Sequence, residues 1–401
     1  MIDNHIFLTI ALVLISTKVL AVFVKRVHLP RVLGALVAGI LLGPSVLNLV
    51  GPNETVSVLA EFGVILLLFS AGMETDFRQL RTCLKASLVI SLFGVAAALG
   101  GGFAVALLFG KPTFESFFIG LVIASISTGI TVEALSEMGK LRTKTGAALM
   151  GASLFNDVIV IVILSVTMGM GGSGFSVPAL SFLLFRILAF FVLAVVVGIF
   201  VNMLFNFMYE KSGRTRQITV FALAYCFLMA YSAEVFGLAD ITGAYIAGIA
   251  FCGTGCAEHL ERKTGGLSHM FFTPIFLANI GFHASFGGLS GSLVLFTLAL
   301  VAVSVLSKLL GCGLGARLGG FGFRESVRVG AGMIARGEVS LIVAAKGIAA
   351  GYIGSLLYPS IIVVVLVTVL ITPLLLKAAF AEKKPGTEVV ATDVVAESAD
   401  G

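Results

Sequence analysis

A carboxylate falls inside one of the most apolar stretches of the chain. Asp157 follows Asn156 and precedes the run Val-Ile-Val-Ile-Val-Ile, and Ser153 lies four residues earlier. Residues four apart share one face of a helix, so we expect Ser153 and Asp157 side by side. A carboxylate inside a membrane is unfavourable unless it is protonated, paired or bound to a cation. Asp157 is therefore a candidate switch between a proton and a cation, and the alternative is a neutral aspartic acid that bridges two helices.

A second polar cluster interrupts the apolar segment before it. The string Ser125-Ile-Ser-Thr-Gly-Ile-Thr131 contains Ser127, Thr128 and Thr131 together with a glycine. We expect this stretch to unwind and to release backbone carbonyl groups. Hydroxyl and carbonyl oxygens are the hard ligands that a dehydrated alkali cation prefers.

A matching interruption is predicted much later in the chain, at Gly330-Ala-Gly-Met-Ile-Ala-Arg-Gly-Glu338. Its charged residues are Arg336 and Glu338. We expect them to neutralise the ends of half-helices or to pair with neighbours, rather than to bind the ion directly.

Lys308 lies deep in another apolar segment, in the string Ser-Lys-Leu-Leu-Gly. It is too far from either end of that segment to reach water, so it must find an acid or lose its proton. The candidate acids are Asp157, Glu338, Glu61, Glu133, Glu137 and Glu234. Of these, Glu137 is expected at a helix end, and pairing within the structure is the default for Glu61 and Glu234.

Other chemistries have little support in the sequence. None of the five histidines falls in the middle of an apolar segment, and the five cysteines lack the close pairing of a thiolate metal site. Gly311-x-Gly-x-Gly315 lies within an apolar segment and lacks the strand that precedes a dinucleotide-binding loop. We expect no cofactor, no catalytic residue and no metal other than a transported alkali cation.

The elements that must position these residues are membrane-spanning helices. Only 12% of the 401 residues are charged, about half the share in soluble domains. Apolar runs of about 20 residues recur, which is the length that spans a bilayer, and the alternation typical of a β-barrel is absent. The sequence predicts an all-α polytopic membrane protein with thirteen spans, near 5–25, 31–50, 55–73, 83–109, 114–137, 145–170, 178–208, 216–236, 240–253, 266–285, 291–316, 326–350 and 357–379.

Lysine and arginine predict the orientation. The odd-numbered connections and the C-terminal tail hold 20 of the 26 basic residues, whereas the even-numbered connections hold only Lys111. Because cytoplasmic loops carry an excess of Lys and Arg, we expect the N-terminus outside and the C-terminus in the cytoplasm, in the inner membrane of a cell. The polar, acidic tail over 381–401 is expected to be disordered.

The two halves of the chain share a short sequence. Gly34-Ala-Leu-Val-Ala-Gly39 of the second predicted helix reappears as Gly243-Ala-Tyr-Ile-Ala-Gly248 of the ninth, and Ser70-Ala-Gly-Met73 has a weak echo in Ala278-Asn-Ile-Gly281. An offset of seven helices gives the copies opposite orientations, as in the inverted repeats of secondary transporters. Helices 1–6 and 8–13 would be the copies, with helix 7 as a linker. The alternative is chance recurrence of small residues in membrane helices.

Five motifs are spread over nearly the whole chain. They are Pro30-Arg-Val-Leu-Gly34 to Gly43-Pro-Ser45, Leu66-Leu-Leu-Phe-Ser-Ala-Gly-Met-Glu-Thr-Asp76, Asn156-Asp157, Lys308 and Ala335-Arg-Gly-Glu-Val339. Together they resemble the monovalent cation/proton antiporter superfamily, specifically the bacterial Na⁺/H⁺ and K⁺/H⁺ exchangers of its second branch.

The resemblance implies the sodium/proton antiporter fold, with inverted repeats and two discontinuous crossing helices. Residues 1–380 would form the transmembrane antiporter domain. Helices 1–3 and 8–10 would be its dimerisation part and helices 4–6 and 11–13 its ion-translocating core. The family works as a homodimer by elevator-type alternating access.

The resemblance leaves the stoichiometry open. Electrogenic relatives tend to carry Asp-Asp with a lysine in helix 11, and electroneutral relatives tend to carry Asn-Asp with an arginine there. This chain combines Asn156-Asp157 with Lys308. One acid favours one proton per cation and hence electroneutral exchange, whereas a lysine that releases its proton when the cation binds would add a second.

We therefore expect a secondary antiporter that exchanges a monovalent cation for H⁺, with Na⁺ favoured over K⁺ and Li⁺. Asp157 would bind either the proton or the cation. The other expected roles are Thr128 and Ser153 in the cation shell, Asn156 between the helix crossing and helix 6, and Lys308, Arg336 and Glu338 in balancing core charge, with Ser127 and Thr131 at the helix break. The alternatives are K⁺/H⁺ antiport and, in a different class, a sodium-coupled symporter of organic solutes. The expected partners are membrane lipid and a second copy of the chain, and not nucleic acid.

Overall fold

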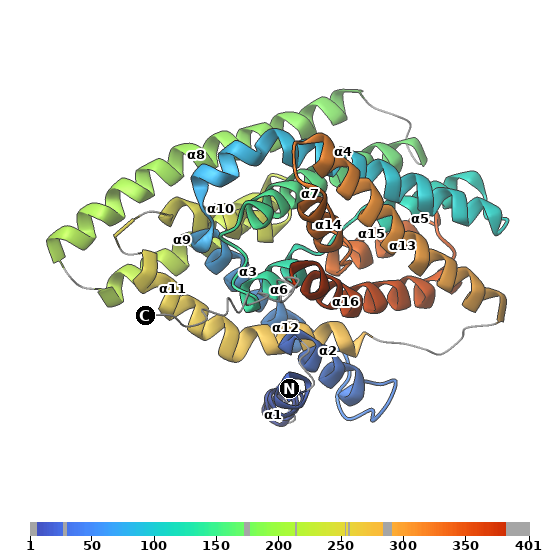
Figure 1. Cartoon of the computed structure of the whole chain (residues 1–401), viewed down its shortest axis with the longest axis horizontal. Helices are drawn as coiled ribbons and strands as arrows, with labels where there is room; N and C mark the ends of the chain where they lie inside the picture. Colours follow the sequence, from blue (N-terminus) through green and yellow to red (C-terminus); the bar gives the residue numbers. More distant parts are fainter. Residues whose placement is uncertain are drawn as a thin grey trace, which may run out of the picture.

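The structure is a computed structural model, and it describes residues 6–26, 30–171, 177–212, 215–252, 254–255, 257–283 and 291–381. All elements in these ranges are helices (Figure 1). They are α1 (Ile6–Arg26), α2 (Arg31–Leu42), α3 (Glu54–Glu74), α4 (Phe77–Leu108), α5 (Thr113–Ala124), α6 (Thr128–Glu137), α7 (Lys144–Gly171), α8 (Val177–Ser212), α9 (Thr215–Val235), α10 (Asp240–Phe251), α11 (Ala257–Leu267), the π-helix η1 (Ser268–Phe272), α12 (Thr273–Phe282), α13 (Gly291–Leu318), α14 (Phe323–Gly332), α15 (Glu338–Ala349), the 3₁₀ turn η2 (Ser355–Leu357) and α16 (Tyr358–Phe380). Apart from Ala381, the tail expected to be disordered lies outside the described residues.

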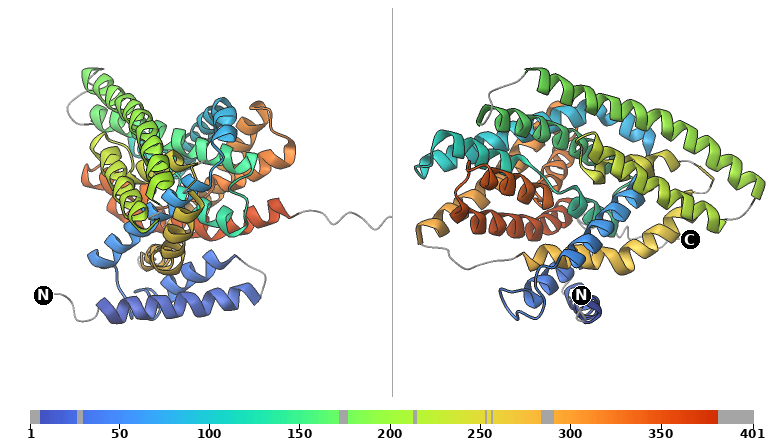
Figure 2. Two further views of the ribbon diagram at one scale, coloured as in Figure 1. Left: turned by 90° about the vertical axis from the view of Figure 1, so that its left-hand side faces the viewer. Right: turned by 180° about the vertical axis from the view of Figure 1, so that it is seen from behind.

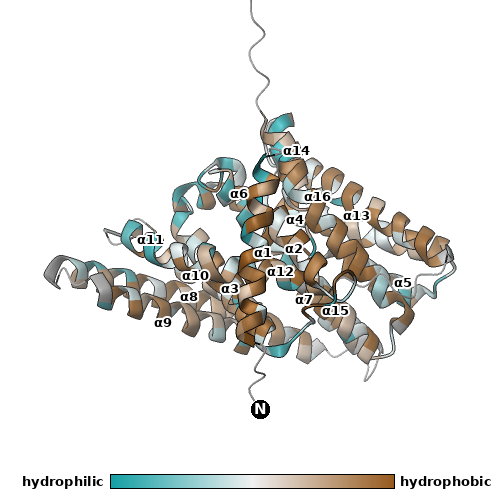
Figure 3. Ribbon diagram, turned by 90° about the horizontal axis from the view of Figure 1, so that it is seen from below, coloured by the Kyte–Doolittle hydropathy of each residue, from teal (hydrophilic) through white to brown (hydrophobic). Residues whose placement is uncertain are grey.

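Within the described ranges, nine helical segments are long and apolar enough to cross a bilayer, with α5 and α6 counted as one interrupted segment. The prediction of thirteen spans is therefore not confirmed. The other four predicted spans coincide with α2, with α10, with η1 and α12 in series, and with the interrupted pair α14 and α15, each of which is short or broken. Figure 3 shows apolar residues along most helices and polar residues on α11 and α14.

The helices α1 and α8 lie at opposite edges of the molecule (Figure 2), and both carry exposed apolar side chains. On α1 the Phe7 side chain is 78% exposed, and on α8 the Ile199 side chain is 68% exposed. Continuous exposed apolar surface of this kind is unfavourable in water and matches hydrocarbon.

Most of the helices pack within two groups. In the first group α4 packs against α5, α7 and α13, and α13 packs against α14 and α16. In the second group α10 packs against α3 and α9, and α2 packs against α1 and α12. The functional candidates Asp157 and Lys308 lie in the first group, on α7 and α13.

The two glycine-flanked strings found in the sequence make matching contacts in the second group. A Cβ atom at Gly34 would lie 2.7 Å from the backbone of α1, and one at Gly243 would lie 2.1 Å from the backbone of α9. A Cβ atom at Gly39 would lie 2.1 Å from the backbone of α12, and one at Gly248 would lie 2.1 Å from the backbone of α3. In each string the first glycine thus contacts the preceding helix. The second glycines contact α12 and α3, which correspond to the tenth and third predicted helices and so are also seven places apart.

Candidate functional site

The two interrupted helices meet at their interruptions. The backbone N–H of Ser127 donates to the carbonyl of Ala335 at 2.8 Å. The Thr131 hydroxyl donates to the carbonyl of Gly332, the last residue of α14, at 2.7 Å. A helix end leaves backbone groups without intrahelical partners. Here each interruption supplies partners for the other, so the two broken segments fix each other's position.

Gly337 allows this close approach. A Cβ atom at this position would lie 2.5 Å from the Ser127 hydroxyl oxygen, which is closer than a side chain tolerates. One helical turn into α15, the Ser340 hydroxyl lies 2.7 Å from the Ser125 hydroxyl, which adds a second contact between the broken segments.

Arg336 binds the ends of two half-helices. Its side chain is fully buried, and Nε and Nη2 donate to the carbonyl of Ile123 at 3.1 and 2.7 Å. Its Nη1 donates to the carbonyl of Ile334. Ile123 lies at the C-terminal end of α5 and Ile334 lies just beyond α14, where the helix dipole places partial negative charge. Arg336 therefore has the geometry of a structural counter-charge. Glu338 is the first residue of α15, and its side chain lies outside what the structure describes.

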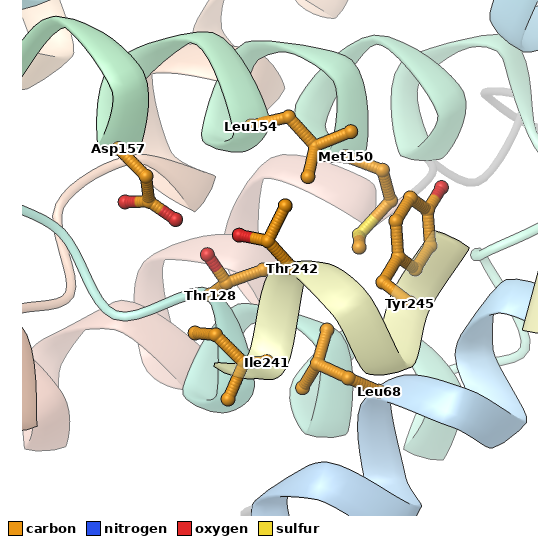
Figure 4. Close-up of a pocket in the computed structure, with 8 residues that line it drawn as sticks. All are labelled: Leu68, Thr128, Met150, Leu154, Asp157, Ile241, Thr242 and Tyr245. Carbon is orange, nitrogen blue, oxygen red and sulfur yellow. The ribbon is translucent and has the colours of Figure 1, made fainter. Parts of the chain in front are cut away.

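Asp157 and Thr128 face the same small cavity (Figure 4). Asp157 is 4% exposed on α7, and Thr128 is 5% exposed as the first residue of α6. The cavity measures about 10 Å³, roughly the space that one water molecule needs. Its other lining residues are Leu68, Met150, Leu154, Ile241, Thr242 and Tyr245.

Ser153 does not line this cavity. Its hydroxyl donates to the sulfur of Met333 at 3.9 Å. The side of α7 that borders the cavity carries Met150, Leu154 and Asp157, a stripe with spacings of four and three residues. Ser153 lies beside this stripe, on the side of Asp157 away from Leu154, and its place in the ion shell stays a prediction.

Lys308 binds the neighbour of Asp157. Its ammonium group donates to the side-chain oxygen of Asn156 at 2.8 Å, and both side chains are fully buried. We expected Lys308 to find an acid or to lose its proton, and expected Asn156 to link the helix crossing to the helix of Asp157. The structure instead joins the two through a hydrogen bond between α7 and α13.

Two acids considered for Lys308 bind elsewhere. The Glu137 carboxylate accepts the backbone N–H of Arg31 at 2.7 and 2.8 Å, which caps the start of α2. The Glu133 carboxylate lies 3.3 Å from Nδ1 of His269 of η1. Both contacts connect α6 with helices of the second packing group.

Sequence reasoning missed Thr242 and Tyr245 of α10, which lie across the cavity from α7. A threonine in a helical run is an ordinary residue, so its type gives no signal. The only indication is its place, directly before the repeated string that begins at Gly243.

The cavity has the chemistry of a site for one small cation. A carboxylate and a hydroxyl supply hard oxygen ligands, and burial excludes bulk water. Its volume does not admit an organic solute.

The chain is similar to known transporters over nearly its whole length. The profile of the family described as "Sodium/hydrogen exchanger, transmembrane" matches residues 9–382. The Na⁺/H⁺-K⁺ antiporter GerN of Bacillus cereus is 35% identical over 381 residues, which are 95% of this chain and 98% of that protein. The Na⁺/H⁺ antiporter of Enterococcus hirae is 33% identical and covers 92% of this chain and 96% of its own. Among solved structures, the sodium proton antiporter MjNhaP1 from Methanocaldococcus jannaschii at pH 8 superposes with a TM-score of 0.67 at 17% identity, over 92% of this chain and 95% of that one.

Proposed function

Because the chain belongs to the sodium/hydrogen exchanger family, a family of multi-pass membrane transporters and not of enzymes, we propose that it exchanges Na⁺ for H⁺ at Asp157. The observation that carries this proposal is the cavity of about 10 Å³ between Asp157 and Thr128, next to the meeting point of two interrupted helices. K⁺ is the second candidate cation, since the name of the Bacillus cereus relative includes it.

Competition for one carboxylate couples the two ions. A protonated Asp157 is neutral, and an ionised Asp157 with a bound alkali cation is neutral as a pair. Either form crosses an apolar barrier more easily than an ionised, unoccupied carboxylate. The site therefore does not cross the barrier while Asp157 is ionised and unoccupied. Each cation that moves one way then requires a proton that moves the other way.

The neighbouring groups support one proton per cation. The amide of Asn156 does not ionise, and the Lys308 ammonium group is bound to that amide. Asp157 is then the one group at the site that exchanges a proton for a cation. Since one proton moves for each cation, we propose electroneutral exchange.

The packing supports an elevator-type mechanism on an inverted repeat. The glycine contacts of α2 and α10 match, and the two interrupted helices are seven places apart in the predicted order. We propose that α4–α7 and α13–α16 form the moving core. We propose that α1–α3 and α9–α12 form a static scaffold that joins two copies into a homodimer, with α8 as the linker. The distribution of Lys and Arg supports an N-terminus outside the cell membrane and a cytoplasmic C-terminus.

Dissipation of a pH gradient in proteoliposomes tests this function. Wild-type protein is expected to dissipate the gradient on addition of Na⁺, and the responding ion among Na⁺, K⁺ and Li⁺ names the substrate. Asp157→Asn is expected to abolish the response, whereas Glu61→Gln, which removes a carboxyl group on α3 that does not line the cavity, is expected to keep it. Insensitivity of the Na⁺ response to a potassium–valinomycin clamp is expected for electroneutral exchange. A response that survives in Asp157→Asn would refute the assignment of the site.

A further inference from the structure

Thr242 brings a third oxygen to the cavity from the opposite side. It lies in the first turn of α10 and is 2% exposed. Figure 4 shows its hydroxyl directed toward the space between the Asp157 carboxylate and the Thr128 hydroxyl. The ion cavity therefore has a polar group on each of its two walls.

The hydroxyl of Thr242 differs from those of most buried threonines. Within helices, threonine hydroxyls usually donate to the carbonyl four residues earlier, as Thr264 and Thr372 do at 2.8 and 2.7 Å. Among the described residues, the buried threonine hydroxyls that have no hydrogen-bond partner are those of Thr128 and Thr242. Both line this cavity. A buried polar group without a partner is unfavourable, and a bound ion that supplies the missing contact is one explanation for it.

Thr242 is held to the second packing group. The Tyr245 hydroxyl, one turn further along α10, lies 3.0 Å from the Thr75 hydroxyl at the end of α3. Gly243 and Gly248 bring the α10 backbone against α9 and α3. The position of Thr242 is therefore set by α3 and α9, whereas Asp157 and Thr128 belong to α7 and α6.

We propose that Thr242 is a cation ligand contributed by the scaffold, present in the conformation described here and lost when the core moves. This inference rests on the proposed antiport function. A neutral hydroxyl stabilises a bound alkali cation and adds nothing comparable for a proton held covalently by Asp157. Thr242 therefore favours the cation over the proton on one side of the membrane only.

Kinetics in proteoliposomes test the ligand role, with the Na⁺ concentration dependence of gradient dissipation as the readout. Thr242→Val keeps the shape of the side chain and removes the oxygen. Loss of one contact to a charged group corresponds to about a tenfold or larger rise in KM for Na⁺, with a maximal rate within about twofold of wild type. Thr242→Ser is expected to restore the wild-type KM. The matched control is Thr264→Val, which removes a buried hydroxyl that is bonded to its own helix and is expected to leave KM unchanged.

Thr242→Cys guards against a folding defect, because it remains small and polar but replaces a hard oxygen with a soft sulfur. It is expected to raise KM as Thr242→Val does. If the KM values of both variants stay within about twofold of the Thr264→Val value, the ligand role is wrong. The proposed function is judged separately in the same assay, since a Na⁺ response of wild type that is lost in Asp157→Asn upholds it whatever Thr242 does.

Sidedness tests the second part of the proposal. KM for Na⁺ is measured in everted and in right-side-out membrane vesicles. Thr242→Val is expected to raise KM about tenfold on one face and less than about twofold on the other. An equal rise on both faces would overturn the claim that the ligand is present in one conformation only.

Discussion

The hydrogen bond between Lys308 and Asn156 makes a measurable prediction about stability. Both side chains are fully buried, and the Lys308 nitrogen lies 2.8 Å from the Asn156 side-chain oxygen. Asn156→Leu removes the acceptor and leaves a buried ammonium group unbound, which costs about 3–5 kcal/mol. Lys308→Met removes the charge and leaves a neutral amide unbound, which costs about 1–3 kcal/mol.

The double variant is expected to be more stable than the sum of these losses predicts. It removes both polar groups and keeps similar volumes, so no buried group remains unbound. The expected coupling is about 1.5–3 kcal/mol in favour of the double variant. In a chain of this length, each kcal/mol shifts the thermal midpoint by about 1–2 °C, so Asn156→Leu is expected to lower it by roughly 5 °C.

The assay is thermal unfolding of the purified protein in detergent, at one scan rate for all variants because such unfolding is often irreversible. Asn202→Leu serves as the control, since the Asn202 amide donates to the carbonyl of Ala250 and shares no partner with Lys308. Its effect is expected to add to that of Lys308→Met. If Asn156→Leu and Lys308→Met are also additive, the hydrogen bond does not couple α7 to α13 and the reasoning is refuted.

Two further predictions concern the tight helix crossing at Gly337 and the cap of α4 at Asp76. Gly337→Ala places a Cβ atom 2.5 Å from the Ser127 hydroxyl oxygen, so it is expected to lower both the yield of folded protein and the Na⁺-dependent rate, and a wild-type rate in proteoliposomes would contradict the tight crossing. The Asp76 carboxylate caps α4 by accepting the backbone N–H groups of Gln79 and Arg78, which lowers its pKa below the usual value. Because the folded-state pKa is the lower one, the stabilisation is complete above the unfolded pKa of about 3.9 and is lost as the pH falls through the folded value. Asp76→Ala is therefore expected to lower the thermal midpoint slightly at pH 7 and not in strong acid, and an equal loss at both pH values would exclude an ionised cap.

The interrupted helices were predictable because their signals are local. Hydroxyls and glycines in Ser125–Thr131, and glycines with two charges in Gly330–Glu338, are rare in membrane helices and mark places where the backbone leaves its regular hydrogen bonding. The structure interrupts the helices at 125–127 and 333–337. The number of spans was less predictable, because a short helix such as α10 and a broken pair such as α14 and α15 fall below the length that defines a span.

The partners of polar side chains were the least predictable feature. An amide beside a carboxylate gives no sign in the sequence of which helix it will face, and Lys308 is 152 residues away from Asn156. Thr242 was missed for the same reason, since only packing shows that its hydroxyl has no carbonyl partner in its own helix. The sequence shows which residues are polar or charged, but only the packing of the helices shows which of them form contacts.

The two adjacent residues Asn156 and Asp157 of α7 point in different directions and therefore make different contacts. Consecutive residues of a helix point about 100° apart, so Asn156 and Asp157 cannot face the same neighbour. Asn156 faces α13 and holds Lys308, and Asp157 faces α10 across the cavity. The Asp157 carboxylate thus lies at the boundary between the two packing groups, where a movement of one group changes its surroundings. The lysine charge lies inside one group and keeps its amide partner during such a movement. An exchange that depends on relative movement of the groups therefore acts on the occupant of Asp157 and leaves the Lys308 contact intact.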